Sequence, residues 1–223
     1  MLAIIFTGGL APPVHVIKVI MQEASSNPLF IAADSGLLSA ESAGLQPDWV
    51  VGDMDSLNDD AKLASLPPQR ILRTEHDKDF TDTEMAFALA IDQGCNDFWI
   101  IGGGGGRIDH LFGIRSLFER DIFPGRWITD SADIWCIDSG QQSKSGHFGK
   151  SEIKHSLEIG AVVSVFPLGG DPWKAKSTGL KWPLDTVVWD RGFFGLSNVA
   201  VDDKFSIKAE SGRFMVILPL PQL

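Results

Sequence analysis

Asp53 and Asp55 are separated by one residue and follow a short apolar stretch that predicts a buried strand. In an extended chain, this spacing places both carboxylates on the same side. Two carboxylates held so close repel each other unless a cation or a proton lies between them. Mg²⁺ suits such a pair, because proteins hold it through one or two carboxylates together with substrate phosphates and water. A solvated acidic turn is the alternative interpretation, since aspartate is common in turns.

A run of five glycines, Gly102 to Gly106, lies between an apolar stretch and a helical pattern. Glycines let the backbone approach a ligand closely, and the start of the following helix favours an anion, so we expect phosphate to bind here. Beside the run, Arg107 can pair bidentately with phosphate oxygens. Asp109 can bind metal, substrate or His110, and His110 is equally well explained as a structural hydrogen-bonding residue. A mobile surface loop is the alternative interpretation of the glycines.

A third polar cluster runs from residue 78 to residue 84, with the sequence K-D-F-T-D-T-E. Thr81 and Glu84 have the spacing of a capping box at the start of a helix, which explains these two residues without any ligand. Capping does not account for Lys78 or Asp79. The next residues, Met85 to Ile91, are apolar on every side of a helix, so we expect the helix to contact a partner subunit as well as its own sheet.

The elements that must position these residues follow from the apolar pattern of the first half. We expect strands at Leu2–Phe6, Leu29–Ala33, Trp49–Val51, Ile71–Arg73 and Phe98–Ile101, and helices near His15–Glu23, from Thr81 onward, and at Ile108–Arg120. Apolar strands that alternate with helices predict an α/β fold, here a Rossmann-like, mainly parallel sheet with helices on both faces. The polar residues that follow the strands should therefore gather along one edge of the sheet.

After Pro124 and Gly125 the pattern changes to short segments separated by turn residues. Strands are expected at Ile134–Asp138, Ala161–Pro167, Thr186–Trp189, Phe205–Ala209 and Phe214–Leu218, with a long hairpin loop at Ser139–Ser156 and turns at residues 177–184 and 195–198. This pattern predicts a C-terminal all-β sandwich domain. We expect an α/β domain at residues 1–125 and the sandwich at residues 126–223.

The composition is that of a globular protein, with 44% hydrophobic and 22% charged residues among 223. The formal net charge of -10 argues against a nucleic-acid binder, which needs basic surface. The two cysteines, Cys95 and Cys136, make neither a disulfide framework nor a zinc site. We find no signal peptide and no apolar run of the ~18 residues that a membrane span requires, so we expect a cytoplasmic protein that binds no membrane.

Six short segments occur together along the chain: Asp34-Ser35-Gly36, G-D-M-D-S at 52–56, K-D-F-T-D at 78–82, G-G-G-G-G-R-I-D-H at 102–110, G-L-K-W-P-L at 179–184, and Ser197-Asn198. In this order the set resembles the thiamine pyrophosphokinase family over nearly the whole chain. The resemblance implies an α/β catalytic domain followed by a β-sandwich domain and a homodimer. It also implies transfer of the pyrophosphoryl group of Mg-ATP to thiamine, with release of AMP.

The resemblance further implies roles for individual residues. Asp53, Asp55 and Asp82 would hold the metal, Mg²⁺, and together with Arg107 and Asp109 they are the expected catalytic residues. The residues expected at ATP and its phosphates are Asp34, Ser35, Ser56, Lys78, Asp79, Thr81, Gly103, Gly104, Gly105, Gly106, Arg107 and His110. The residues expected at thiamine, in a pocket at the interface between two subunits, are Asp82, Trp182, Ser197 and Asn198.

Transfer of a phosphoryl group needs positioning and neutralisation of charge more than covalent help from the protein. We expect the glycine amides and Arg107 to stabilise charge around the β-phosphorus while the thiamine hydroxyl attacks it. Two other functions stay open at this point. One is a metal-dependent transferase that uses a nucleotide and a different acceptor alcohol, and the other is a non-catalytic protein that binds nucleotide or thiamine.

Overall fold

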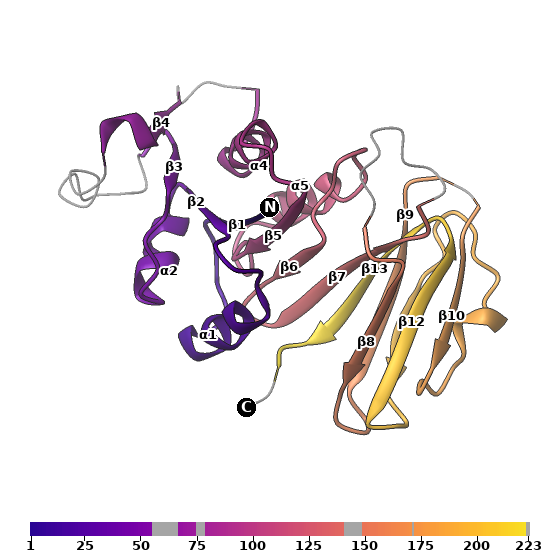
Figure 1. The fold of residues 1–223 in the computed structure, drawn as a ribbon. Helices are drawn as coiled ribbons and strands as arrows, with labels where there is room; N and C mark the ends of the chain where they lie inside the picture. The colour runs from indigo at the N-terminus through magenta and orange to yellow at the C-terminus, as the bar shows by residue number, and fades with distance from the viewer. Residues whose placement is uncertain (55–66, 75–78, 141–148, 171, 222–223) are drawn as a thin grey trace. The chain divides into compact units, whose positions relative to one another are not determined.

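The computed structural model describes residues 1–54, 67–74, 79–140, 149–170 and 172–221. The chain divides into two compact units. The first comprises Met1–Leu117 and Trp127–Ser131, and the second comprises Phe118–Arg126 and Ala132–Pro221. Figure 1 shows the elements of both. Within the described part of the chain, no helix is long and apolar enough to cross a membrane.

The first unit is built on a mainly parallel sheet, as the sequence predicts. Its strands are β1 (Leu2–Phe6), β2 (Leu29–Ala33), β3 (Trp49–Gly52), β4 (Ile71–Arg73), β5 (Asp97–Ile101) and the end of β6 (Arg126–Ile128), in the order β6-β5-β1-β2-β3-β4. β1 pairs in parallel with both β2 and β5, β2 with β3, and β3 with β4. All five residues of β1 are buried, as expected for a strand covered on both faces.

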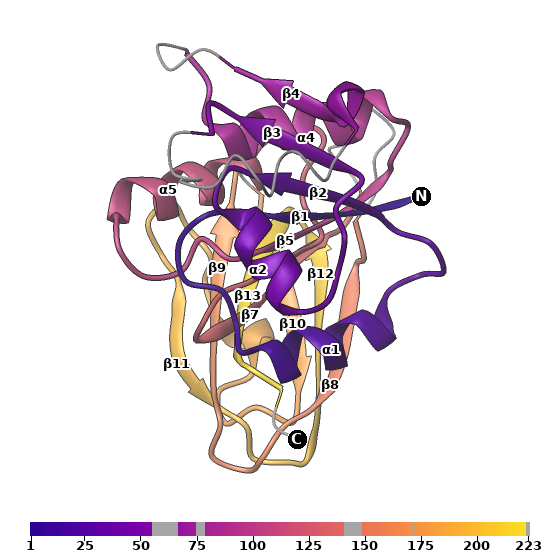
Figure 2. The same ribbon diagram turned by 90° about the vertical axis from the view of Figure 1, so that its left-hand side faces the viewer.

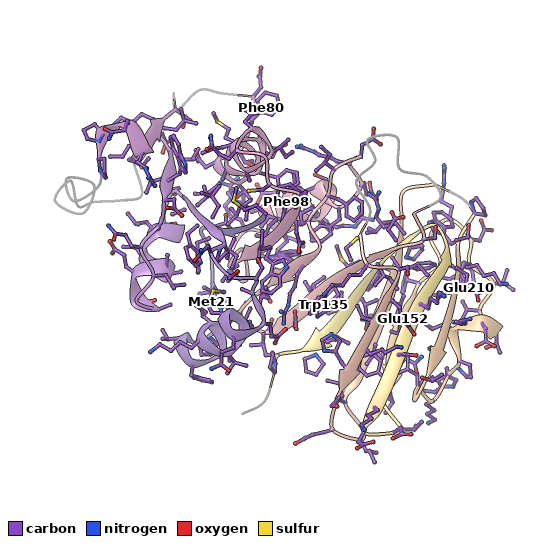
Figure 3. The ribbon with its side chains drawn as sticks, in the orientation of Figure 1. Met21, Phe80, Phe98, Trp135, Glu152 and Glu210 are labelled. Carbon is purple, nitrogen blue, oxygen red and sulfur yellow. The ribbon has the colours of Figure 1, made fainter. Side chains whose placement is uncertain are left out.

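Among the described residues, four helices cover this sheet: α1 (Val14–Glu23), α2 (Gly36–Ser42), α4 (Asp82–Asp92) and α5 (Ile108–Leu117). α1 and α2 lie on one face, and α4 and α5 on the other (Figures 1 and 2). Helices on both faces are therefore confirmed. Phe98, on β5, is enclosed by the core, whereas Phe80, just before α4, projects at the surface with 60% of its area exposed (Figure 3).

The sequence placed the end of α5 too late, at Arg120. The helix ends at Leu117, and the carbonyl oxygens of Phe118 and Arg120 each accept a hydrogen bond of 2.8 Å from Nη1 of Arg213. A side chain distant in sequence thus satisfies carbonyl groups around the end of the helix.

The second unit contains two antiparallel sheets. Its strands are β7 (Ala132–Asp138), β8 (Glu152–Ser156), β9 (Val162–Leu168), β10 (Lys174–Thr178), β11 (Gly195–Val199), β12 (Lys204–Ser211) and β13 (Arg213–Pro219). One sheet has the order β11-β9-β13-β7 and the other the order β10-β12-β8. Buried side chains of both sheets, such as Trp135, Phe214 and Ile207, form a single hydrophobic core.

Three predictions for the second unit are wrong. Thr186–Trp189 is not a strand, because a 3-10 helix (Leu184–Thr186) follows Pro183 and the indole N–H of Trp189 donates back to Leu184 O at 3.3 Å. Residues 152–156 form β8 instead of continuing the loop expected from Ser139. Residues 177–178 and 195–198 belong to β10 and β11 and not only to turns. All three of these strands lie at sheet edges and carry polar residues outward, which hides them in the sequence.

Candidate functional site

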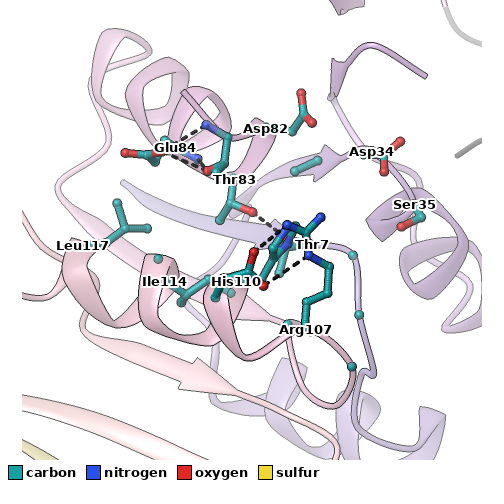
Figure 4. Close-up of a pocket in the computed structure, with 18 of the residues that line it drawn as sticks. Thr7, Asp34, Ser35, Asp82, Thr83, Glu84, Arg107, His110, Ile114 and Leu117 are labelled. Atoms are coloured by element: carbon teal, nitrogen blue, oxygen red, sulfur yellow. Dashed lines mark hydrogen bonds and ion pairs between the residues drawn. The ribbon is translucent and has the colours of Figure 1, made fainter. Parts of the chain in front are cut away.

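A cavity of about 520 Å³ opens in the first unit where β1, β2 and β5 end. Ligands bind at this edge of open α/β sheets because the loops after parallel strands converge there. In Figure 4, Asp34 and Ser35 lie at one side of the cavity, Glu84 and Leu117 lie at the other, and Arg107 lies between them. The expected site residues that line it are Asp34, Ser35, Thr81, Asp82, Gly103, Gly105, Gly106, Arg107, Asp109 and His110.

The five-glycine run folds back on the segment that follows β1. The N–H groups of residues 102–104 donate, at 2.8–2.9 Å, to the carbonyl oxygens of Ile128, Gly8 and Leu10 respectively. Three of the five N–H groups therefore donate to other backbone groups of the protein. We expected the whole run to bind phosphate through its N–H groups, but these three are not available for it. Among the residues that the structure describes, the N–H groups of Gly105 and Gly106 have no acceptor, and both residues line the cavity.

Gly104 and Gly106 are glycines for different reasons. A Cβ atom on Gly104 would collide with the Asp130 carboxylate and lie 2.9 Å from the carbonyl oxygen of Leu10. Gly106 has a φ of +65°, and no atom lies within 4 Å of the position of its missing Cβ. Packing therefore requires Gly104, whereas backbone conformation favours glycine at position 106 and leaves open space there.

Arg107 and Asp109 form an ion pair at the start of α5. Nε of Arg107 donates to Oδ1 of Asp109 at 3.1 Å, and Nη2 donates to Oδ2. These hydrogen bonds lower the pKa of Asp109 and raise the pKa of Arg107. Both side chains are well exposed, at 72% and 59%. The guanidinium therefore lines the same cavity as Gly105 and Gly106, and its solvated partner is one that a phosphate can replace.

Asp34 and Asp82 approach each other across Gly52, the last residue of β3. A Cβ on Gly52 would lie 3.3 Å from Oδ1 of Asp82 and 3.4 Å from Cβ of Asp34. Asp34 has a φ of +49°, and its Oδ1 atom is buried with no hydrogen-bond partner in the described structure. Asp82 Oδ1 also accepts a hydrogen bond of 3.3 Å from the Thr74 hydroxyl. Asp53 follows Gly52 directly and is half-buried.

The other expected metal and phosphate residues fall into two groups. Asp55, Ser56 and Lys78 lie outside the described residues. Asp79 is exposed, and neither Asp53 nor Asp79 lines the cavity. Within the described ranges, no three His, Cys, Asp or Glu side chains are assembled as a metal site.

The start of α4 forms the wall of the cavity opposite α5. The capping box predicted from the sequence is confirmed: Glu84 N–H donates to Thr81 Oγ1 at 3.2 Å, and Thr81 N–H donates to Glu84 Oε2 at 3.0 Å. The buried hydroxyls of Thr83 and Thr7 share a hydrogen bond of 2.5 Å. The segment after β1 is thereby joined to the first turn of α4, in which Asp82 lies.

The residues expected at thiamine that lie in the second unit differ in exposure. Trp182 is 51% exposed, whereas Asn198 is 4% exposed. Oδ1 of Asn198 accepts from the backbone N–H of Trp182 at 3.1 Å, and Nδ2 donates to the carbonyl oxygen of Trp182 at 2.7 Å. Ser197 is exposed with a φ of +59°. The Asn198 amide thus fixes the backbone of Trp182.

Sequence reasoning missed several residues of the cavity wall. Thr7, Gly8 and Gly9 line it, and so do Thr83, Glu84, Gly113, Ile114 and Leu117. The pair Gly8-Gly9 directly after a buried strand is the same signal as the longer glycine run, so the sequence contained it. Gly113 was also visible as a glycine inside a helical pattern.

Two family models match the chain. The catalytic domain of thiamin pyrophosphokinase matches residues 20–122, and the vitamin B1 binding domain of thiamin pyrophosphokinase matches residues 150–214. Together they cover well over half of the chain, and the cavity described above lies mainly within the first match.

Curated proteins and solved structures with these names are also similar. Thiamine pyrophosphokinase 1 of Oryza sativa subsp. japonica is 27% identical over 77% of this chain and 66% of that protein. Thiamine pyrophosphokinase of Bacillus subtilis is 26% identical over 78% of both chains. The crystal structure of the enzyme from Bacillus subtilis superposes with a TM-score of 0.75 at 22% identity, covering 100% of each chain. That of Candida albicans gives 0.68 at 13% identity, covering 99% of this chain and 89% of that one. The structural likenesses show a shared fold.

Proposed function

The chain belongs to the thiamin pyrophosphokinase family, and we propose that it transfers the pyrophosphoryl group of ATP to the hydroxyl of thiamine. The products are thiamine diphosphate and AMP. One observation from the structure supports this most strongly. The cavity is lined by the carboxylates of Asp34 and Asp82, by the Arg107 guanidinium, and by two glycines whose amides have no acceptor among the described residues. A metal-bound triphosphate requires these three kinds of group.

Mg²⁺ fits the acidic side of the cavity. The buried Oδ1 of Asp34 needs a partner, and a divalent cation held between Asp34 and Asp82 would provide one. Asp53, which follows β3 directly, would complete the set. Asp55 is proposed as a further ligand from the sequence pattern alone, because it lies outside the described residues. The sequence suggested that Asp34 contacts the phosphates of ATP. We propose instead that it binds the cation, because a carboxylate repels phosphate oxygens. The cation supplies neutralisation of the triphosphate charge.

The residues of the glycine loop act on the phosphates. The N–H groups of Gly105 and Gly106 and the Arg107 guanidinium donate to the oxygens of the β-phosphate, where negative charge rearranges during transfer. The thiamine hydroxyl oxygen bonds to the β-phosphorus, and the bond from that phosphorus to the oxygen of the α-phosphate breaks. AMP leaves with that oxygen, and a cavity carboxylate accepts the hydroxyl proton. His110 on α5 and Ser35, at the side of the cavity where Asp34 lies, are further polar groups for binding ATP.

Thiamine binds at the second domain, which we take as a β-sandwich at residues 126–223 after an α/β domain at residues 1–125. The exposed Trp182 ring offers a face for the aromatic rings of thiamine, and Ser197 lies on the neighbouring strand. Asn198 acts through Trp182, since its amide is committed to that backbone.

A homodimer would complete the site. Ala88 of α4 is exposed and Met85, Leu89 and Ile91 are only half-buried in the single chain, so the apolar helix still has a side available for a partner subunit. We place Asp82 of one subunit and Trp182 of the other at one thiamine pocket. Because the reaction consumes ATP, the cytoplasm is the location that fits it.

The test of the activity is to mix purified protein with ATP, Mg²⁺ and thiamine and to identify the nucleotide product. AMP together with thiamine diphosphate supports the proposal. ADP indicates a simple kinase, AMP formed only with another alcohol indicates a different acceptor, and no turnover favours a binding protein. Chelation of Mg²⁺ should abolish turnover.

The shared pocket is tested by mixing two inactive variants, Asp82→Asn and Trp182→Ala, and letting subunits exchange. In each heterodimer one pocket collects both lesions and the other collects neither, so activity should return to about a quarter of wild type at equimolar random assortment. If mass measurements confirm exchange and no activity returns, each pocket is built within one chain.

A further inference from the structure

α5 carries a glycine in its interior. Gly113 lies five residues after the helix begins at Ile108 and four before it ends at Leu117. Glycine at such a position lowers helix stability relative to alanine, because it loses more backbone freedom and buries no side chain. We therefore asked why position 113 is glycine and not alanine.

The usual intramolecular reasons do not apply to Gly113. Its φ is not in the left-handed region, and no atom lies within 4 Å of the position that a Cβ would take. Its carbonyl oxygen accepts the Ser116 hydroxyl at 2.7 Å, a bond that any residue at position 113 could make. Neither backbone conformation nor packing within the described chain requires glycine here, in contrast to Gly104.

Gly113 faces the cavity. It lines the cavity together with His110, Ile114 and Leu117. The spacing of these four residues, i, i+3, i+4 and i+7, is that of one face of a helix. The open space in front of Gly113 therefore lies on the side of α5 that the cavity occupies.

The chemistry of the cavity changes along this face. Gly106 and Arg107 precede the helix with an N–H group and a positive charge, and Gly113 lies about 9 Å farther along the helix axis. Beside it lie Ile114, 5% exposed, and Leu117, fully buried. ATP has the same order of groups, with a charged triphosphate at one end and a flat nucleoside at the other.

We propose that Gly113 is the residue against which the nucleoside of ATP packs, and that the missing side chain provides the space for it. This inference rests on the proposed function, since it takes ATP as the occupant of the cavity. The consequence is specific. Alanine at position 113 should stabilise the free protein and weaken binding of the nucleotide, two effects of opposite sign.

The experiment compares the full-length wild type with Gly113→Ala and Gly113→Leu. The melting temperature of Gly113→Ala should rise by about 2–4 °C from helix propensity. Its KM for ATP should rise roughly tenfold, and that of Gly113→Leu further, because added methyl groups occupy the space of the ligand. Inhibition by AMP should weaken to the same extent. The KM for thiamine and inhibition by inorganic tripolyphosphate, which has no nucleoside, should stay unchanged.

Ser116→Ala is the matched control, because Ser116 is exposed on the same helix and does not line the cavity. It should leave the KM for ATP unchanged. An unchanged KM for ATP in Gly113→Ala would overturn the inference whatever its melting temperature, as would weaker binding of tripolyphosphate or thiamine. If the wild type makes no AMP, the proposed function fails. Calorimetric titration of AMP into wild type and Gly113→Ala then still decides whether Gly113 contacts a nucleoside.

Discussion

The two units contain the same ion pair, arginine with aspartate, in opposite surroundings. In the first unit, Arg107 and Asp109 are 72% and 59% exposed beside the cavity. In the second, Arg126 and Asp133 are 1% and 4% exposed, joined by two hydrogen bonds of 2.8 and 2.7 Å. The Arg126 guanidinium also lies 4.2 Å from the centre of the Trp135 ring. Burial decides what the pair can do, because a desolvated charge must keep its partner, whereas a solvated one can exchange it for a ligand.

The same contrast extends to the other polar groups of each unit. In the second unit, Arg213 donates to the Asp138 carboxylate at 2.6 Å and to two backbone carbonyls, so its charge holds the fold. In the first unit, Asp34 Oδ1 is buried without a partner, and the Gly105 and Gly106 amides have no acceptor in the described structure. Arg213 therefore stabilises the second unit, whereas Asp34 and the Gly105 and Gly106 amides remain available for a ligand in the first.

The largest effect should come from Asp82→Asn, which keeps the size of the side chain and removes its charge. We expect kcat/KM for ATP to fall by roughly 10³-fold, comparable to the loss of a group that acts on transition-state charge. The melting temperature should change by less than about 2 °C, as for an ordinary half-buried substitution in this size of protein. Asp92→Asn, at the exposed end of the same helix, should change neither quantity. A large loss of stability in Asp82→Asn would mean that Asp82 stabilises the fold, as Arg126 and Asp133 do, and is not a group kept available for a ligand.

The reverse result is expected for Arg126→Met. Removing one partner of a buried pair leaves the Asp133 charge uncompensated and should lower the free energy of unfolding by about 3–5 kcal/mol. Urea denaturation measures this value, and kcat of the protein that stays folded should equal that of wild type. Arg126→Met combined with Asp133→Leu should recover most of the stability. If the free energy of unfolding falls by less than about 1 kcal/mol, the buried pair contributes no more to stability than an exposed pair does.

Two glycines of one loop sharpen the comparison. Gly104→Ala should lower the free energy of unfolding by about 1–3 kcal/mol, because its methyl group collides with Asp130 and the Leu10 carbonyl. Gly106→Ala should cost about 1 kcal/mol for its left-handed backbone, and it should raise the KM for ATP more than Gly104→Ala does. Thermal unfolding of both variants measures the loss of stability, and steady-state kinetics measures the change in the KM for ATP. Equal kinetic effects would mean that the loop acts on ATP as one unit.

The smallest effect concerns the exposed pair and pH. The pKa of Asp109 is lowered by hydrogen bonds from Arg107, so any stabilisation by the pair is present above the ordinary pKa of aspartate and is lost as pH falls through the lowered pKa. Both side chains are solvated, so Arg107→Ala should leave the melting temperature unchanged at pH 7. It should raise the pKa of Asp109 toward its ordinary value, which NMR titration of the carboxyl carbon measures. An unchanged pKa would show that the pair does not form in solution.

Much of the first unit could be predicted because its elements carry local signals. The bounds of β1 and β2 agree with the expected ranges, since strands covered on both faces are continuous apolar runs. The bounds of β4 agree as well, although this short strand lies at the sheet edge and is largely exposed. The capping box of Thr81 and Glu84 is equally local, because both partners lie within one helical turn. In the second unit, β8, β10 and β11 bury only one face at a sheet edge, and their polar outer residues resemble loops.

By itself, the sequence determined that a glycine run, a series of aspartates and an arginine follow strands that end at one edge of a sheet. Only the tertiary structure decided which of them remain available for a ligand. Gly104 is occupied by Leu10 and packed against Asp130, Asn198 is committed to the Trp182 backbone, and Gly113 is left open to the cavity. The reason is physical: the availability of a polar group depends on its hydrogen-bond partners and burial, and these come from residues distant in sequence.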